Sequence, residues 1–301
     1  MNKGLVIAMT AALLTGSTAV DAQDVNIGKS NIVLSSDVMT PEALWAMGRI
    51  ASVKPSPDGK NIVYQVGYYS VKENKGHQVL RVMDATGKND RLLTTSAKSE
   101  SDPIWLDNNT IAYLSGGQLW TMNANGGNRK QLTHSDLDIE GFKFSPNKKQ
   151  VVLIKSIPYY GTIAKNPDDL DKTTGLLIND MNYRHWDHYV QTNTHPFLAE
   201  VTAAGVSEGV DIMEGEPFES PVAPFGGIEQ IDWSKDSKKI AYTSRKKEGV
   251  QYAISTDTDI YLYDIASKTT INLCKPAGYQ EPKIDATKSM RNQEVNHQAG
   301  D

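Results

Sequence analysis

The chain has 301 residues, 31 basic and 36 acidic side chains, and a formal net charge of -5 at neutral pH. This small acidic excess leaves no basic surface for nucleic acid or for an anionic membrane, so we expect neither partner. The single cysteine, Cys274, excludes an intrachain disulfide, and we expect it to lie half-buried on a strand.

The N-terminus has the pattern of a secretory signal peptide. A short basic region, Asn2-Lys3, precedes an apolar run from Leu5 to Leu14 that is too short to span a bilayer, and Val20-Asp21-Ala22 suits a cleavage site. No cysteine follows the apolar run, which disfavours a retained lipid anchor. We therefore predict a signal peptide at 1–22, a leader at 23–37, and a periplasmic or secreted bacterial protein with no membrane span after cleavage.

One short helix is predicted after the leader. Thr40 is a good N-cap, Pro41 suits the first helical position, and Leu44, Trp45 and Met47 can face a core. We expect this helix to plug the first repeat against its neighbour rather than to carry chemistry.

A tight turn that leads into a short apolar strand recurs along the chain. In the first copy Pro57 suits the first central turn position, and Asp58 and Gly59 suit the corner. The copies lie at residues 53–64, 103–113, 144–153 and 232–242, and the second lacks the Ser-Pro pair. Their apolar runs follow one another at intervals of 49, 40 and 89 residues, of which the first two are typical of β-propeller blades.

Three of the copies continue with two more strands. A strand that ends in Asp or Asn is followed by a polar turn and a further strand, at residues 79–94, 118–133 and 259–273. A four-stranded blade needs this content. We therefore predict an all-β fold: a partial β-propeller of about four WD40-like or TolB-like blades over residues 38–282, with one N-terminal helix.

The long interval marks an insertion at about residues 156–226. It carries the aromatic stretch 183–189 and then residues 195–201, whose alternation predicts a further strand of the same blade. An insertion of this size in a repeat array maps to a loop on one face, often the binding face.

The segment 205–209, Gly-Val-Ser-Glu-Gly, matches the G-x-S-x-G pattern of hydrolase nucleophiles at Ser207. That chemistry needs a strand, a strained turn and a helix, with Asp and His later in the chain. Here the segment is polar, no helical period follows, and the only later histidine is His297. We interpret it as a polar turn and predict no catalytic residue in this chain.

Three histidines of the insertion invite a metal-site interpretation. His185 and His188 are spaced as on one helix face, and His195 lies beyond them. Zinc needs a third ligand and a supporting shell, and the surrounding tyrosines and tryptophan favour an aromatic loop packed on the propeller. We predict neither a metal nor another cofactor.

An acidic run at residues 212–220 lies on the return path of the insertion. Its carboxylates belong to Glu214, Glu216 and Glu219, beside Gly and Pro, and could pair with a ligand ammonium by charge-assisted hydrogen bonds. The simpler interpretation is an acidic solvated loop, because carboxylates are normally exposed.

These residues together resemble the N-terminal half of secreted bacterial members of the prolyl oligopeptidase family of serine peptidases. The dipeptidyl-peptidase-V-like and acylaminoacyl-peptidase-like branch is the most similar, and the likeness covers about residues 38 to 282. It is carried by the helix and first turn, the Arg-His-Trp-Asp stretch of the insertion, the acidic run and the fourth repeat: residues 40–45, 55–60, 184–187, 214–217, 232–234, 241–246 and 259–264.

The resemblance implies a propeller that gates access to a separate α/β-hydrolase domain with a Ser, Asp and His triad. None of those triad residues has a match here. It also implies that the full-length parent acts on a peptide substrate, and that carboxylates of the propeller can hold the amino terminus of this peptide. Glu214, Glu216 and Glu219 are the candidates. The chain would then be the propeller part of an exopeptidase that releases dipeptides or acyl-amino acids, and inactive alone.

The C-terminal residues 283–301 are polar and patternless, with too little apolar content to pack. We expect an irregular tail, and a gene product that is truncated or frame-shifted relative to the family. The alternative function is a non-catalytic, periplasmic TolB-like propeller that acts as a protein-binding scaffold.

Overall fold

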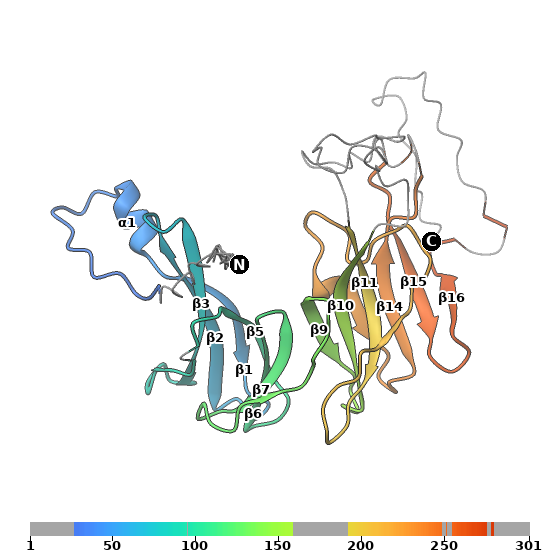
Figure 1. Cartoon of the computed structure of the whole chain (residues 1–301), viewed down its shortest axis with the longest axis horizontal. Coiled ribbons are helices and arrows are strands. Elements are labelled where there is room, and N and C mark those ends of the chain that lie inside the picture. Colours follow the sequence, from blue (N-terminus) through green and yellow to red (C-terminus); the bar gives the residue numbers. More distant parts are fainter. Residues whose placement is uncertain are drawn as a thin grey trace, which may run out of the picture.

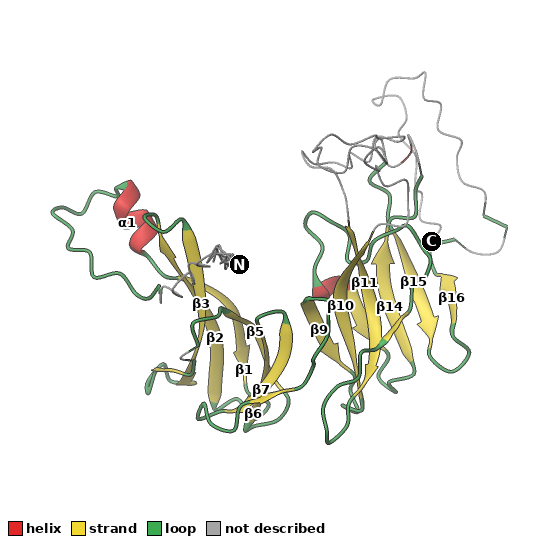
Figure 2. Ribbon diagram, viewed as in Figure 1, coloured by secondary structure: helices red, strands yellow, loops and turns green. Residues whose placement is uncertain are grey.

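The computed structural model describes residues 27–94, 96–158, 192–248, 251, 255–275 and 278–279. These residues form four antiparallel sheets of four strands each, and the chain runs through each sheet from one edge to the other (Figure 1). Strands dominate the described residues, which also include the helix α1 and the short 3-10 helix η1 (Figure 2). The predicted all-β fold with about four blades is confirmed.

The strand order within each blade follows the sequence. Blade 1 contains β1 (Arg49–Pro55), β2 (Asn61–Ser70), β3 (Lys75–Asp84) and β4 (Arg91–Leu92). Blade 2 contains β5 (Glu100–Trp105), β6 (Thr110–Ser115), β7 (Gln118–Asn123) and β8 (Lys130–Gln131). Blade 3 contains β9 (Ile139–Phe144), β10 (Gln150–Pro158), β11 (Thr192–Glu200) and β12 (Val210–Asp211). Blade 4 contains β13 (Ile231–Trp233), β14 (Lys239–Ser244), β15 (Asp259–Asp264) and β16 (Thr269–Asn272), and η1 (Ile228–Gln230) precedes it.

The recurring turn links the first two strands of blades 1, 3 and 4. In blade 3 the hydroxyl of Ser145 donates to Asn147 Oδ1 at 2.8 Å and accepts the N–H of Gln150 at 3.1 Å. Ser56 and Ser234 make the same two contacts in their own blades. The serine before the corner therefore holds both ends of the turn together.

Apolar side chains from one sheet face pack against the next blade, as the period-two alternation of the strands predicts. The blade 1–2 core includes Val63, Leu80 and Tyr113, and Ala112, Leu153 and Ala199 belong to the blade 2–3 core. The blade 3–4 core contains Ile154, Met213, Ile231, Ile240 and Tyr242, among others. Each interface is thus built by two neighbouring blades.

Tryptophans on the first strands also connect neighbouring blades. The indole N–H of Trp105 donates to Lys54 O at 3.0 Å, and that of Trp233 donates to Lys143 O at 2.9 Å. Phe144 occupies the matching position of blade 3, opposite the first apolar residue of the next strand. Its phenyl ring has no N–H group that could donate such a bond. The blade 1–2 and blade 3–4 boundaries therefore share a bond that the blade 2–3 boundary lacks.

The predicted helix is present as α1 (Pro41–Ala46), with the Thr40 hydroxyl accepting the N–H of Ala43. Its predicted packing is wrong, because Leu44, Trp45 and Met47 are exposed and only Ala43 is buried. A helix of this length has too little surface to form a core. Trp45 instead packs edge-on against Tyr69, with the Arg49 guanidinium over both rings.

The insertion enters and leaves blade 3 between two long strands. β10 and β11 pair continuously from Gln150 and Glu200 to Pro158 and Thr192, which confirms the strand predicted at residues 195–201. We call this end of the strands the insertion end, and the opposite end, with the recurring turns, the turn end. The predicted signal peptide, the aromatic stretch at 183–189 and the tail at 283–301 lie outside the described residues.

No helix among the described residues combines the length and the apolar content needed to cross a bilayer.

Candidate functional site

The acidic segment at residues 211–220 lies at the insertion end of blades 3 and 4. It leaves β12 and is held by His195 on β11, which is fully buried. His195 Nδ1 lies 2.8 Å from Asp211 Oδ2, and Nε2 lies 2.8 Å from Phe218 O. A carbonyl oxygen only accepts, so Nε2 donates its hydrogen to Phe218 O, and Nδ1 lies within hydrogen-bond distance of the carboxyl group. Both ring nitrogens are occupied, which removes His195 from any metal site.

A turn in this segment places its first glutamate at the surface. Met213 is buried, its N–H donates to Asp211 Oδ1, and its carbonyl oxygen accepts the N–H of Glu216 at 2.9 Å. Gly215 has a φ of +80°, which a glycine adopts without strain. Glu214 is exposed at the tip of this turn and makes no ion pair among the described residues.

Glu216 is half-buried and paired with a lysine. Its Oε2 atom lies 2.5 Å from Lys246 Nζ, which stands 4.2 Å from the centre of the Tyr261 ring. Tyr242 stacks on Tyr261 with ring centres 5.5 Å apart. Burial, followed by the negative charge of Glu216, raises the pKa of Tyr242. The pair therefore rests on an aromatic surface provided by blade 4.

Glu219 is buried, and Arg245 lies beside it. Arg245 Nη2 is 3.6 Å from Glu219 Oε1, and both side chains are about 95 % shielded from solvent. The hydroxyl of Ser244, at the end of β14, donates to Glu219 O at 2.9 Å. This glutamate anchors the acidic segment to blade 4.

Two more ion pairs extend the charged surface along blade 4. Lys247 pairs with Asp257 at 3.0 Å, and Lys275 pairs with Asp259 at 2.8 Å. Burial pushes the pKa of Asp259 upward, but the hydrogen bonds and positive charges around it, those of Lys275 first, outweigh burial and leave it below its usual value. Cations and anions therefore alternate over this end of the blade.

Of the three glutamates predicted to bind an amine, Glu214 is the one that faces solvent without a cation beside it among the described residues. The basic run at 245–247 supplies the partners of Glu216 and Glu219, and no sequence pattern singled it out as part of the site. Charge complementarity between that run and the acidic run could have revealed the pairing, although the two are far apart in sequence.

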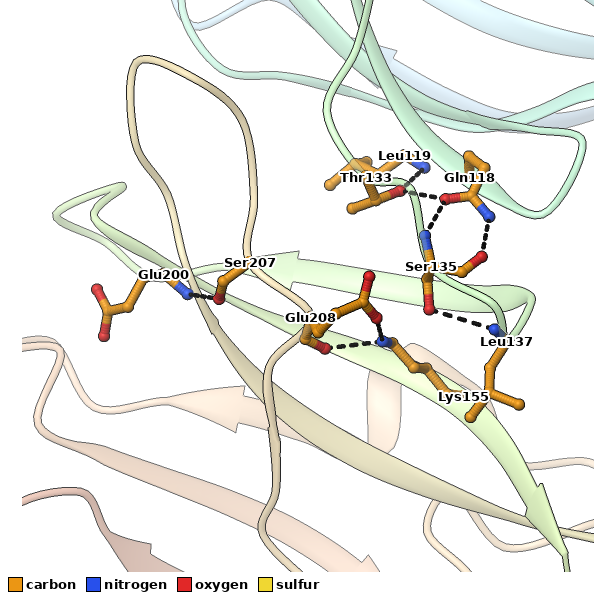
Figure 3. Close-up of polar contacts among 9 residues, drawn as sticks. All are labelled: Gln118, Leu119, Thr133, Ser135, Leu137, Lys155, Glu200, Ser207 and Glu208. Atoms are coloured by element: carbon orange, nitrogen blue, oxygen red, sulfur yellow. Dashed lines mark hydrogen bonds and ion pairs between the residues drawn. The ribbon is translucent and has the colours of Figure 1, made fainter.

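Ser207 lies in a polar turn, as interpreted from its sequence (Figure 3). Its Oγ accepts the N–H of Glu200 at 2.9 Å, and its own N–H donates to Glu200 O at 3.0 Å. The next residue, Glu208, pairs with the buried Lys155 Nζ at 3.0 Å. That lysine lowers the pKa of Glu208. Ser207 therefore closes the link between β11 and β12 and is not raised on a strand-to-helix turn.

Two other sequence-based assignments have different outcomes. His185 and His188 lie outside the described residues. Cys274 follows β16 and is exposed, so the prediction of a half-buried strand cysteine is wrong. The blade ends before this residue, which leaves its thiol at the surface, where the sulfur lies 3.4 Å from the N–H of Ile260.

Comparisons with known proteins agree with the architecture. The chain is 40% identical over 278 residues to dipeptidyl-peptidase 5 of Porphyromonas gingivalis, which covers 91% of this chain and 40% of that protein. It is 37% identical over 243 residues to dipeptidyl-peptidase 5 of Porphyromonas endodontalis, covering 79% of this chain and 35% of the relative. No family model matches the chain.

Among solved structures, acylaminoacyl peptidase of Pyrococcus horikoshii shares the fold. The TM-score is 0.51 at 10% identity, over 76% of this chain and 33% of that one. The four blades and these likenesses define the chain as a propeller of the kind that peptidases carry. It belongs to the prolyl oligopeptidase family of serine peptidases, as its propeller region. The chain spans about two fifths of the length of the curated relatives named above.

Proposed function

We propose that this chain is the substrate-gating propeller of a secreted bacterial exopeptidase that releases dipeptides or acyl-amino acids from peptides. The observation that carries this proposal is the 40% identity to a dipeptidyl-peptidase 5 over nine tenths of the chain. The occupied hydroxyl of Ser207 supports a chain that hydrolyses nothing by itself. The signal-peptide pattern supports export to the periplasm or beyond the cell.

The acidic segment supports a role in holding the substrate's amino terminus. Glu214 is free to contact an ammonium group directly, and Glu216 can exchange Lys246 for it, because the two cations would compete for one carboxylate. Glu219, held by Arg245, keeps the segment in place. The site lies at the insertion end, the face on which repeat proteins often bind ligands.

A hydrolysis assay tests the absence of activity. The purified mature chain is incubated with a panel of dipeptidyl and acyl-aminoacyl fluorogenic substrates, and in parallel with a serine-directed fluorophosphonate probe. We expect neither turnover nor labelling. Turnover with labelling at Ser207 would overturn both the proposal and the interpretation of the 205–209 segment.

A binding assay tests the amine anchor. Calorimetric titration with a tripeptide amide that has a free amino terminus should show binding, and the N-acetylated tripeptide amide should bind about tenfold more weakly, because one charge-assisted contact is lost. Glu214→Gln should remove this difference, whereas Glu73→Gln, on an exposed turn of blade 1, should keep it. Equal binding of the free and acetylated peptides by the unmodified chain would contradict the anchor and support a scaffold of the TolB-like kind.

A further inference from the structure

A cavity of about 400 Å³ lies on the face of blade 2 that packs against blade 1. Strand register brings its walls together: Glu100 pairs with Ser115, and Tyr113 pairs with Trp120. Paired residues share a sheet face, so the carboxyl group and the two rings line one surface. Lys98 and Arg129 add two cations to the lining.

Glu100 is an unusual group in the lining of this cavity. Its side chain is 2% exposed, Oε1 lies 3.1 Å from Arg129 Nη1, and Oε2 is buried with no hydrogen-bond partner among the described residues. Burial raises the pKa of Glu100 to about 7, and the nearby Arg129 opposes this rise without cancelling it. A buried, half-satisfied carboxyl group is costly to the fold, which points to a role in binding.

Arg129 is fixed in place by the neighbouring backbone. Its Nε donates to Gly126 O at 3.2 Å, and Nη2 donates to Leu93 O in blade 1. A Cβ at Gly126 would stand 3.1 Å from Leu93 O, and φ there is +86°, so the close approach of the two blades needs glycine. Three of the five N–H donors of Arg129 are used by these contacts and by Glu100, and the Tyr113 hydroxyl lies beside Arg129 as well, which leaves at least one donor for a ligand.

Lys98 is the second cation in the lining of the cavity. It is exposed, it lies against Gly116 in the turn between β6 and β7, and it makes no ion pair among the described residues. Arg129 and Lys98 together outweigh the single carboxyl group of Glu100, so the cavity has a net positive charge. The aromatic walls of Tyr113 and Trp120 suit an apolar or planar body.

We propose that this cavity binds a small carboxylate-bearing molecule, with its carboxylate on Arg129 and Lys98 and its apolar body against Trp120 and Tyr113. The volume is in the range of small-molecule sites. The chemistry fits either a free organic acid or the C-terminus of a short peptide. The cavity lies in blade 2 and shares no residue with the acidic segment of blades 3 and 4, so the two proposals stand independently.

Binding should be linked to a proton. The ionisable groups that line the cavity with Glu100 are Lys98, Tyr113 and Arg129. A bound anion draws on the positive charge of Arg129 and disfavours ionisation of the nearby carboxyl group, so Glu100 takes up a proton when the ligand binds. Affinity is therefore higher below neutral pH than above it.

Calorimetric titration of the full chain with N-acetylphenylalanine and with its carboxamide tests the site. We expect the acid to bind about tenfold more tightly than the carboxamide, since the charge-assisted contacts are lost in the amide. The acetyl group removes the amine that the acidic segment would recognise, so failure of either proposal leaves the other untouched. Adding 3-phenylpropionate separates the two sources: equal binding indicates an organic acid, and weaker binding indicates a peptide C-terminus. Equal affinity for acid and carboxamide, or no binding of any probe, would overturn the proposal.

Variants locate the binding to this cavity. Lys98→Met should lower the affinity for N-acetylphenylalanine about tenfold. Lys72→Met, which replaces an exposed lysine in a turn of blade 1, should leave this affinity unchanged. The affinity of the unmodified chain should fall by up to about tenfold between about pH 6 and pH 8, and Glu100→Gln should abolish that pH dependence. Lys98→Met with unaltered affinity, or a pH dependence retained in Glu100→Gln, would show that the acid binds elsewhere.

Discussion

Glu100 shows how one buried side chain can govern the pH dependence of the whole fold. Its carboxyl group has a pKa of about 7 in the folded chain, against an ordinary value of 4.5, because burial disfavours its charge. A raised pKa means that the folded chain binds this proton more tightly than the unfolded chain. The stability that Glu100 contributes is therefore complete below pH 4.5 and is lost as pH rises to about 7.

We expect Glu100→Gln to remove that loss. Between pH 4.5 and pH 7 the unfolding free energy of the unmodified chain should fall by up to about 3 kcal/mol relative to that of the variant. Urea denaturation of both proteins at a series of pH values measures the difference, in which other titrating groups cancel. A difference that is constant over this range would mean that Glu100 is ionised throughout.

Ser145 stabilises its turn through one small hydroxyl group. It is 1% exposed and makes contacts on both sides of the turn, at Asn147 and Gln150. We expect Ser145→Ala to lower the unfolding free energy by about 1–2 kcal/mol, because the backbone N–H of the half-buried Gln150 and the side chain of Asn147 lose their partner. Thermal unfolding measures the effect, and Ser36→Ala, in the exposed leader, serves as the matched control. Equal melting temperatures for the two variants would contradict the role assigned to the turn serine.

At the scale of elements, the acidic segment depends on β11. His195 links the strand to both ends of that segment, through Asp211 and Phe218. Replacing it with alanine leaves a nearly buried carboxyl group without its partner, so His195→Ala should cost about 3 kcal/mol of stability. The exposed His134→Ala should change it by less than about 0.5 kcal/mol. Chemical denaturation compares the two, and similar losses would show that the imidazole is not a structural link.

The strands could be predicted from sequence because each carries its signal locally. The Ser-Pro turn and the β-branched run after it are short-range patterns, and they recur at intervals of 40–50 residues. The register of β10 with β11 agrees with the alternation at residues 195–201. The burial of α1 could not be predicted, because helix caps such as Thr40 define where a helix begins and not what covers it. The exposure of Cys274 was missed because β16 ends at Asn272, so this residue does not lie on a strand.

The candidate sites were harder to predict, because their parts meet only in three dimensions. The acidic run was visible, but Lys246 and Arg245 reach it from another blade. Glu100 and Arg129 are also far apart in sequence, and nothing in either neighbourhood marks a cavity. Ser207 shows the opposite case: a local motif suggested chemistry, and hydrogen bonds to Glu200 gave it a structural role.

At the scale of the molecule, the two faces of blade 4 have different environments. One face carries Ile240 and Tyr242 into the core shared with blade 3. On the other face Ile260, Ile271 and Leu273 are 46%, 57% and 51% exposed. Exposed apolar surface of this kind favours association.

Two charges on this outer face should therefore reduce association without unfolding the chain. We expect Ile260→Lys combined with Ile271→Lys to lower the binding of an apolar fluorescent dye and the fraction of oligomer in analytical ultracentrifugation, with a melting temperature within a few degrees of the parent. The control is Ile32→Lys combined with Val33→Lys, on the exposed leader. Unchanged dye binding and sedimentation would mean that this face does not attract partners.

The indole hydrogen bonds from Trp105 to Lys54 O and from Trp233 to Lys143 O group the four blades into two pairs. They couple blade 1 to blade 2 and blade 3 to blade 4, whereas Phe144 provides no such bond at the middle boundary. That boundary is held by side-chain packing, by the backbone hydrogen bonds from Ile139 N–H to Gly117 O and from Val206 N–H to Leu132 O, and by the contacts of Lys130 with Ala203 O and of Lys148 with Leu106 O. We expect opening fluctuations to begin at this middle boundary, because it lacks the indole bond of the other two. The four blades would then exchange their amide hydrogens as two cooperative pairs, and the molecule would bend in the middle before either pair lost its structure.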